Sequence, residues 1–82
     1  MSKTDGLGYE QLLALRVMRG TKDIEGSAIC KEAGCSFQEL YDLAQKGLIN
    51  IGSERLKPKA LHPTMTAEGM ATLDEAEREA II

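Results

Sequence analysis

The chain has 82 residues and a formal net charge of −3, and a chain of this length forms one small domain. Hydrophobic residues make up 43% of it, which suffices for a single core. The negative charge argues against a strongly basic, non-specific coat for nucleic acid, and no apolar run approaches the roughly 20 residues that span a bilayer. We therefore expect a cytoplasmic protein with no membrane partner.

The charge is unevenly distributed along the chain. From Thr66 onward there are five acidic residues against Arg78 alone, a net charge of −4, so the residues before Thr66 sum to +1. The acidity therefore belongs to the C-terminal part, and the rest of the chain is still compatible with a partner that carries phosphate.

Three helices are predicted in the first half of the chain, after a flexible leader at residues 1–7. Residues 8–19 are crowded with Leu, Val and Met, and Gly20 is expected to end this helix. Because its apolar residues cover more than one face, the helix is expected either to lie at the centre of the core or to form part of a dimer interface. A second helix is expected from about Gly26 to Ala33.

A tight turn and a third helix follow. Gly34 tolerates the left-handed backbone conformation that such a turn needs. Ser36 and Glu39 have the spacing of a capping box, in which each side chain bonds the backbone N–H of the other residue. The third helix is therefore predicted over residues 37–46, with Gly47 as its C-terminal stop.

The pattern becomes extended after Gly47. Residues 48–51 and 61–66 are predicted to be strands, and Ile24 is a candidate for a further short strand. The polar loop at 52–60 is basic and carries Arg55, Lys57 and Lys59. Pro63 cannot donate a ladder hydrogen bond, but a two-stranded hairpin tolerates it because both of its strands are edges.

Thr66 is expected to cap a fourth helix that runs to about Ala80, with Met70, Leu73 and Ala76 or Ala80 facing inward. The predicted order is helix, helix, helix, strand, loop, strand, helix. This order predicts a mostly α fold with a small β-hairpin wing, in which residues 8–82 form one winged helix-turn-helix domain.

The stretch from Ile29 to Leu73 resembles the winged-helix regulators of the MarR and PadR type. The matching residues are Ile29-x3-Ala33-Gly34-Cys35-Ser36, Leu40-x2-Leu43-x3-Gly47-Leu48-Ile49 and Met65-Thr66-x2-Gly69-x3-Leu73. The chain differs from these families at the wing, where Glu54-Arg55 replaces an Asp-x-Arg pair, and it lacks the long terminal helices through which MarR proteins dimerise. The resemblance implies a small transcriptional regulator that binds double-stranded DNA, with its third helix in the major groove and its wing on the backbone or the minor groove.

Leu40, Leu43 and Ala44 are expected to face the core, which leaves the polar residues of the third helix outward. Gln bonds adenine bidentately, Tyr packs on a thymine methyl or bonds phosphate, and Ser at a helix N-terminus suits a phosphate contact. Cations on the wing would neutralise phosphates and make binding salt-dependent. The predicted DNA-binding residues are Ser36, Gln38, Tyr41, Gln45, Lys46, Arg55, Lys57 and Lys59.

A protein-binding module is the alternative function, because winged helices are also used for docking and a fold does not determine a function. Glu39 and Asp42 on the third helix would repel phosphates, which suits an acidic adaptor or inhibitor that docks on a larger complex. The DNA-binding function predicts a homodimer, since one small domain reads only a few base pairs. The first helix and the terminal Ile81 and Ile82 are its candidate contacts.

No catalytic constellation is recognisable in the sequence. His62 is the only histidine and has no evident partner in its predicted strand. Cys30 and Cys35 are the only cysteines, whereas a zinc site needs four ligands, so both are expected to be reduced packing residues. We therefore expect a protein that is not an enzyme and that uses no metal or cofactor.

Overall fold

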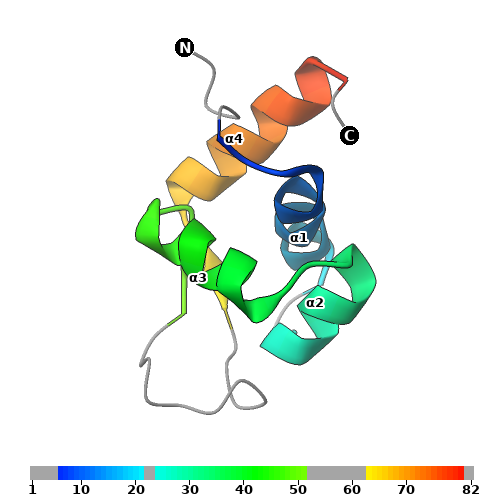
Figure 1. The fold of residues 1–82 in the computed structure, drawn as a ribbon. Helices are drawn as coiled ribbons and strands as arrows, with labels where there is room; N and C mark the ends of the chain where they lie inside the picture. Colours follow the sequence, from blue (N-terminus) through cyan, green and yellow to red (C-terminus); the bar gives the residue numbers. More distant parts are fainter. Residues whose placement is uncertain (1–5, 22–23, 52–62, 81–82) are drawn as a thin grey trace.

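The computed structural model describes residues 6–21, 24–51 and 63–80, and in these residues four helices surround one core. The elements follow the order α1 (Tyr9–Gly20), α2 (Gly26–Ala33), α3 (Phe37–Gln45), β1 (Ile49–Asn50), β2 (Thr64–Met65) and α4 (Ala67–Arg78) (Figure 1). This order confirms the predicted fold class, which is mostly α with a small antiparallel sheet between α3 and α4. The topology is winged-helix-like. None of the helices in the described residues has the length and apolarity needed to cross a membrane.

The two strands form a short antiparallel ladder. Ile49 lies opposite Met65, and Asn50 lies opposite Thr64. Both strands are shorter than predicted, since the ladder extends over two residues on each side. The predicted loop at 52–60 and the first residues of the second predicted strand, 61–62, lie outside the described residues. Ile24 belongs to no strand, and its half-buried side chain packs against the core instead.

Helix α1 is the central element of the core (Figure 1). It packs against α2, α3, α4 and β2. Its buried apolar side chains are Leu12, Ala14, Leu15 and Met18. Leu13 and Val17, on another face, are half-buried and pack against the same core. The wide apolar surface of this helix is therefore used within the domain, while a homodimer stays a prediction and Ile81 and Ile82 lie outside the described residues.

Local sequence signals account for the turn between α2 and α3. Gly34 ends α2 in the left-handed conformation with φ 73°, and the N–H of Cys35 donates to the carbonyl of Cys30 over 3.2 Å. The hydroxyl of Ser36 accepts from the N–H of Glu39, and the Glu39 carboxylate accepts from the N–H of Ser36. Both the left-handed glycine and the capping box were predicted, and both are confirmed.

Helices α3 and α1 end in different ways. Gly47, with φ 77°, follows α3 as predicted. Gly20 was expected to stop α1 in the same way, but it is the last helical residue, and Thr21 after it has an extended backbone with φ −137°. The N–H of Thr21 still donates to the carbonyl of Val17 over 3.0 Å, so the last turn of α1 closes without a left-handed residue.

Helix α4 begins at the predicted cap but buries a different face. The Thr66 hydroxyl accepts from the N–H of Gly69 over 3.1 Å. The buried residues of the helix are Gly69, Thr72, Leu73 and Ala76, whereas Met70 is 38% exposed. Leu73 and Ala76 are therefore inward as predicted, with Ala76 rather than the alternative Ala80, whereas the inward placement of Met70 was wrong. Gly69 packs directly against the carbonyl of Leu48, just before β1, where a Cβ atom would lie 2.1 Å from that oxygen, and the larger Met70 is turned outward.

Candidate functional site

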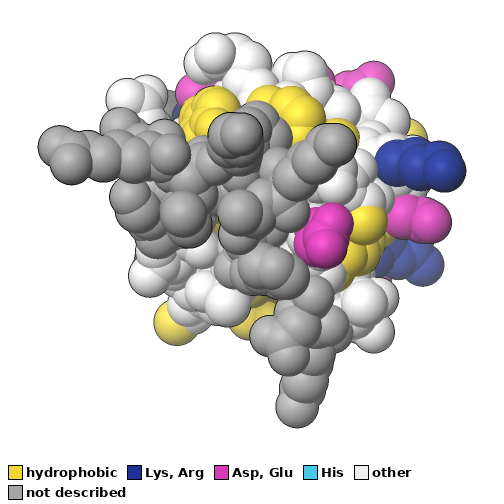
Figure 2. Space-filling model, turned by 90° about the horizontal axis from the view of Figure 1, so that it is seen from below, with side chains coloured by type: hydrophobic (Ala, Val, Ile, Leu, Met, Phe, Trp, Pro, Cys, Tyr) yellow, Lys and Arg dark blue, Asp and Glu magenta, His cyan; other side chains and the backbone are white. Residues whose placement is uncertain are grey.

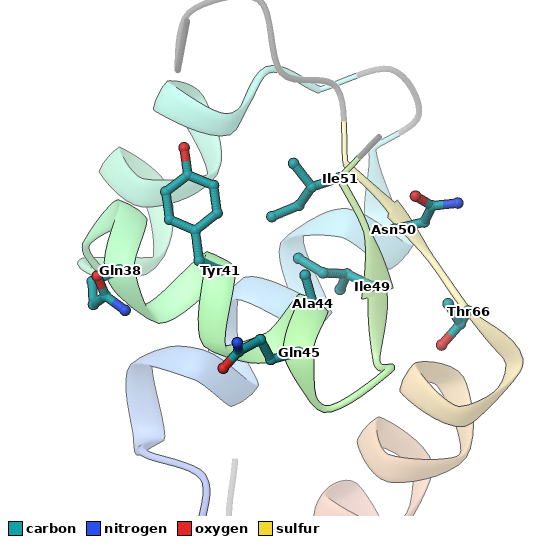
Figure 3. Close-up of a pocket in the computed structure, with 8 residues that line it drawn as sticks. All are labelled: Gln38, Tyr41, Ala44, Gln45, Ile49, Asn50, Ile51 and Thr66. Carbon is teal, nitrogen blue, oxygen red and sulfur yellow. The ribbon is translucent and has the colours of Figure 1, made fainter. Parts of the chain in front are cut away.

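An open pocket lies between α3 and the strand pair (Figure 3). It is lined by Gln38, Tyr41, Ala44, Gln45, Ile49, Asn50, Ile51 and Thr66. The two isoleucines are buried and form the apolar part of the wall, whereas Gln38, Gln45 and Asn50 are exposed around it. None of the described lining residues carries a charge at neutral pH, so the surface is polar but uncharged.

Three of the predicted contact residues share one face of α3. Gln38, Tyr41 and Gln45 are spaced by three and four residues, which places them on the same side of a helix. Figure 3 shows all three along α3 beside the strand residues. Tyr41 is half-buried, and its ring packs against the core, which limits its freedom of rotation. Helical periodicity therefore predicted this group, which we call the amide face and define as Gln38, Tyr41 and Gln45.

The acidic residues of α3 lie beside the amide face rather than on it. The carboxylate of Glu39 is held in the capping box with Ser36. Asp42 accepts a hydrogen bond from Lys46 over 2.8 Å and a second one from the side chain of Gln11 over 3.1 Å. Both acids are half-buried on the flank of α3 that faces α1. Repulsion of a phosphate by these two groups is therefore reduced by their internal partners.

Gln11 on α1 holds this flank of α3 in position. Its side chain is buried, with 5% of the residue exposed, and uses both ends of its amide. The carbonyl oxygen accepts from the N–H of Gly8 over 2.9 Å. The NH2 group donates to the backbone carbonyl of Glu39 and to the carboxylate of Asp42, each over 3.1 Å. A buried amide is costly unless it is hydrogen-bonded, and here the surrounding groups satisfy it.

Ser36 and Lys46 were predicted to contact phosphate, and both have partners within the domain. The Ser36 hydroxyl is the N-cap of α3. The Lys46 ammonium pairs with Asp42 and also donates to the carbonyl of Gly6 over 3.4 Å. Arg55, Lys57 and Lys59 lie outside the described residues. Of the predicted DNA-binding residues, the pocket therefore brings together Gln38, Tyr41 and Gln45.

The pocket also contains residues that sequence reasoning missed. Ala44, which was predicted to face the core, packs against it as a half-buried residue and also lines the pocket. Asn50 and Thr66 were not predicted to be site residues. Asn50 joins the pocket as part of the strand ladder, and Thr66 joins it as the residue between β2 and α4. Asn50 follows the buried Ile49, so strand alternation could have indicated its outward position. No local signal places Thr66 there, since its hydroxyl donates to the carbonyl of Gly47 over 2.7 Å only in the folded chain.

The other cations of the described residues do not gather at the pocket. Arg19 on α1 forms a two-pronged pair with Glu77 and lies 3.8 Å from Asp74, both on α4. The hydrogen bond from Arg19 holds the pKa of Glu77 below its ordinary value. Figure 2 shows cationic and acidic side chains close together at its right edge, the side of α2. A concentration of positive charge at the site therefore depends on the predicted wing cations.

The cysteines are packing residues, as predicted. Both are free thiols, with Cys35 buried and Cys30 half-buried. Burial, together with a hydrogen bond to Cys30, raises the pKa of Cys35 to about 12, so this thiol stays protonated at neutral pH. Within the described residues, no three His, Cys, Asp or Glu side chains are grouped in a way that could hold a metal ion.

No protein-family model and no curated protein matches the chain. The winged-helix-like topology therefore rests on the order and pairing of the elements. The site is accordingly described by its own geometry, in which an uncharged amide face on α3 borders a strand pair and the acids are held to one side.

The decrease in the free energy of unfolding at acid pH should depend partly on Asp42. Hydrogen bonds from Lys46 and Gln11 hold the pKa of Asp42 below its ordinary value of 3.8. The stabilisation is therefore present above that value and is lost as the pH falls through the lower pKa of the folded state. We expect Asp42→Asn to lose less stability than the wild type between pH 6 and pH 3 in urea unfolding. Lys46→Met should have the same effect in part, and curves parallel to the wild type would contradict the expectation.

Proposed function

We propose that the protein is a small DNA-binding transcriptional regulator that inserts α3 into the major groove of double-stranded DNA. The observation that carries the proposal is the amide face, an uncharged row of side chains with two exposed glutamines on the helix that follows the turn. The major groove admits an α-helix, and Gln side chains match the hydrogen-bonding edge of adenine. The neighbouring strand pair corresponds to the base of a wing, in keeping with the MarR- and PadR-like pattern of the sequence.

The position of the acids supports DNA over a protein partner. A docking function for the acidic residues of α3 would need Glu39 and Asp42 to be available to the partner. Both are already bound within the domain, to the α3 N-terminus and to Gln11 and Lys46. The groups that remain exposed on the amide face are neutral donors and acceptors, which suit base edges.

The wing cations should supply the electrostatic part of binding. We expect the triple change Arg55→Ala, Lys57→Ala and Lys59→Ala to weaken binding to mixed-sequence duplex DNA for all sequences. It should also reduce the slope of log K against log salt by about 0.9 for each phosphate contact that is lost. Fluorescence anisotropy with a labelled duplex at several salt concentrations measures both quantities.

A matched control separates a wing contact from net charge. Arg16, Lys31 and Arg78 are exposed residues on three different helices, and changing all three to Ala removes the same charge from the protein. This control should retain more affinity and a steeper salt slope than the wing variant. Equal losses in both variants would overturn the wing contact. Absence of wild-type binding at low salt would overturn DNA binding itself and favour a protein partner.

A further inference from the structure

The two glutamines of the amide face are a matched pair of exposed side-chain amides. Gln38 and Gln45 are exposed, and neither side-chain amide forms a hydrogen bond with any of the described residues. They are seven residues apart, nearly two full turns, so they lie on one side of α3 at an axial separation of about 10.5 Å. Tyr41 lies between them on the same face (Figure 3).

The separation of Gln38 and Gln45 along α3 determines how far apart the two base pairs that they contact lie on the DNA. Base pairs rise by about 3.4 Å along the duplex axis, but a helix in the major groove lies oblique to that axis and travels farther for each base pair. Residues spread over about two helical turns contact three successive bases in this geometry, so Gln38 and Gln45 meet base pairs about two steps apart. A glutamine amide offers one acceptor and one donor group, which adenine matches with its N6 amino group and N7.

The remaining side chains of α3 argue against readout of G·C pairs. Guanine is read chiefly by Arg or Lys. Helix α3 itself contains neither, and Lys46, which follows its last residue, pairs with Asp42. Cytosine is read by carboxylates, but Glu39 and Asp42 are held by partners on the flank. Tyr41 presents an aromatic edge at mid-face, which suits contact with a thymine methyl.

We infer that α3 recognises two A·T base pairs two steps apart, with Gln38 on the adenine of one pair and Gln45 on the adenine of the other. This inference rests on the proposed DNA-binding function and adds the identity and the spacing of the bases. Tyr41 is the third contact and packs between them.

Selection from a duplex pool tests the inference directly. The full chain is incubated with duplexes that carry a randomised central segment, and the bound fraction is sequenced. We expect enrichment of two A·T pairs two steps apart. In competition anisotropy, replacing either pair by G·C should weaken binding by about 5- to 150-fold, the range for loss of one bidentate contact.

Two single variants assign the bases. Gln38→Ala should remove the preference at one A·T pair and Gln45→Ala at the other, while Arg16→Ala, a change on exposed α1 surface, should leave the selected sequence unchanged. Selection of G·C pairs, of another spacing, or of the same sequence by all three variants would overturn the inference while leaving DNA binding intact. Failure of the wild type to retain any duplex at low salt would overturn both the inference and the proposed function.

Discussion

Gly69→Ala is expected to lower the free energy of unfolding by about 3 kcal/mol, the upper part of the range for overpacking a well-packed site. A Cβ atom at this position would lie 2.1 Å from the carbonyl oxygen of Leu48 and 2.7 Å from Cγ of Met65. The Met65 side chain can move, but the Leu48 carbonyl belongs to the backbone just before β1. The first turn of α4 would therefore have to move away from the strand pair.

The contact that would be disturbed is part of a connected set. The same Leu48 carbonyl accepts the N–H of Thr66 over 3.1 Å, and the Thr66 hydroxyl caps α4 through the N–H of Gly69. Displacement of α4 would strain both hydrogen bonds. Thermal and urea unfolding, followed by circular dichroism, measure the loss.

Gly20→Ala is the matched control for this prediction. Gly20 is also a helical glycine, but it is exposed, and a Cβ atom there would have no neighbour within 4 Å. Alanine has the higher helix propensity, so this variant should be as stable as the wild type or more stable by up to about 1 kcal/mol. A Gly69→Ala variant as stable as Gly20→Ala would show that α4 does not approach the Leu48 carbonyl as closely as described.

Gln11→Leu is expected to lower the free energy of unfolding by about 2 to 3 kcal/mol, although Leu has nearly the same volume and a better helix propensity. The change leaves the N–H of Gly8 and the carbonyl of Glu39 without the partners they have now. It also takes one of the two hydrogen bonds from Asp42. Removing one side of a buried hydrogen-bonded group costs more than the bond itself contributes, because the remaining groups stay desolvated.

The control for this variant is the same chemical change at an exposed glutamine. Gln45→Leu removes an amide that forms no hydrogen bond with the described residues and should alter stability by no more than about 0.5 kcal/mol. Equal effects of Gln11→Leu and Gln45→Leu in urea unfolding would contradict the role of Gln11. Only Gln45→Leu should change which DNA sequence is selected when affinities are compared at a temperature where both variants are folded.

Local interactions explain most of what could be predicted about the elements. The turn at Gly34 and the capping box of Ser36 and Glu39 involve residues at most five apart, so their geometry follows from the order of the residues. The caps at Gly47 and Thr66 are local in the same sense. Helix boundaries were therefore correct to within two residues, and Gly20 was wrong only in how the helix ends.

Tertiary contacts account for the errors. Hydropathy favours Met70 over Gly69 and Thr72 for the inner face of α4, but the distance between α4 and the Leu48 carbonyl admits only small residues there. Thr72 is buried because its hydroxyl donates to the carbonyl of Glu68 over 2.8 Å, which satisfies it without a partner on another element.

The sequence by itself determined the order of the elements, the turn and caps around α3, and the alignment of Gln38, Tyr41 and Gln45, because these depend on neighbours within one or two helical turns. Only the tertiary structure decided how the flank of α3 that carries Asp42 is held. Gln11 is separated from Glu39 by 28 residues and from Asp42 by 31, and no local pattern predicts that its amide holds them. No local pattern predicts that Asn50 and Thr66 line the pocket either, because pairing of the strands places Asn50 there and packing of α4 places Thr66 there.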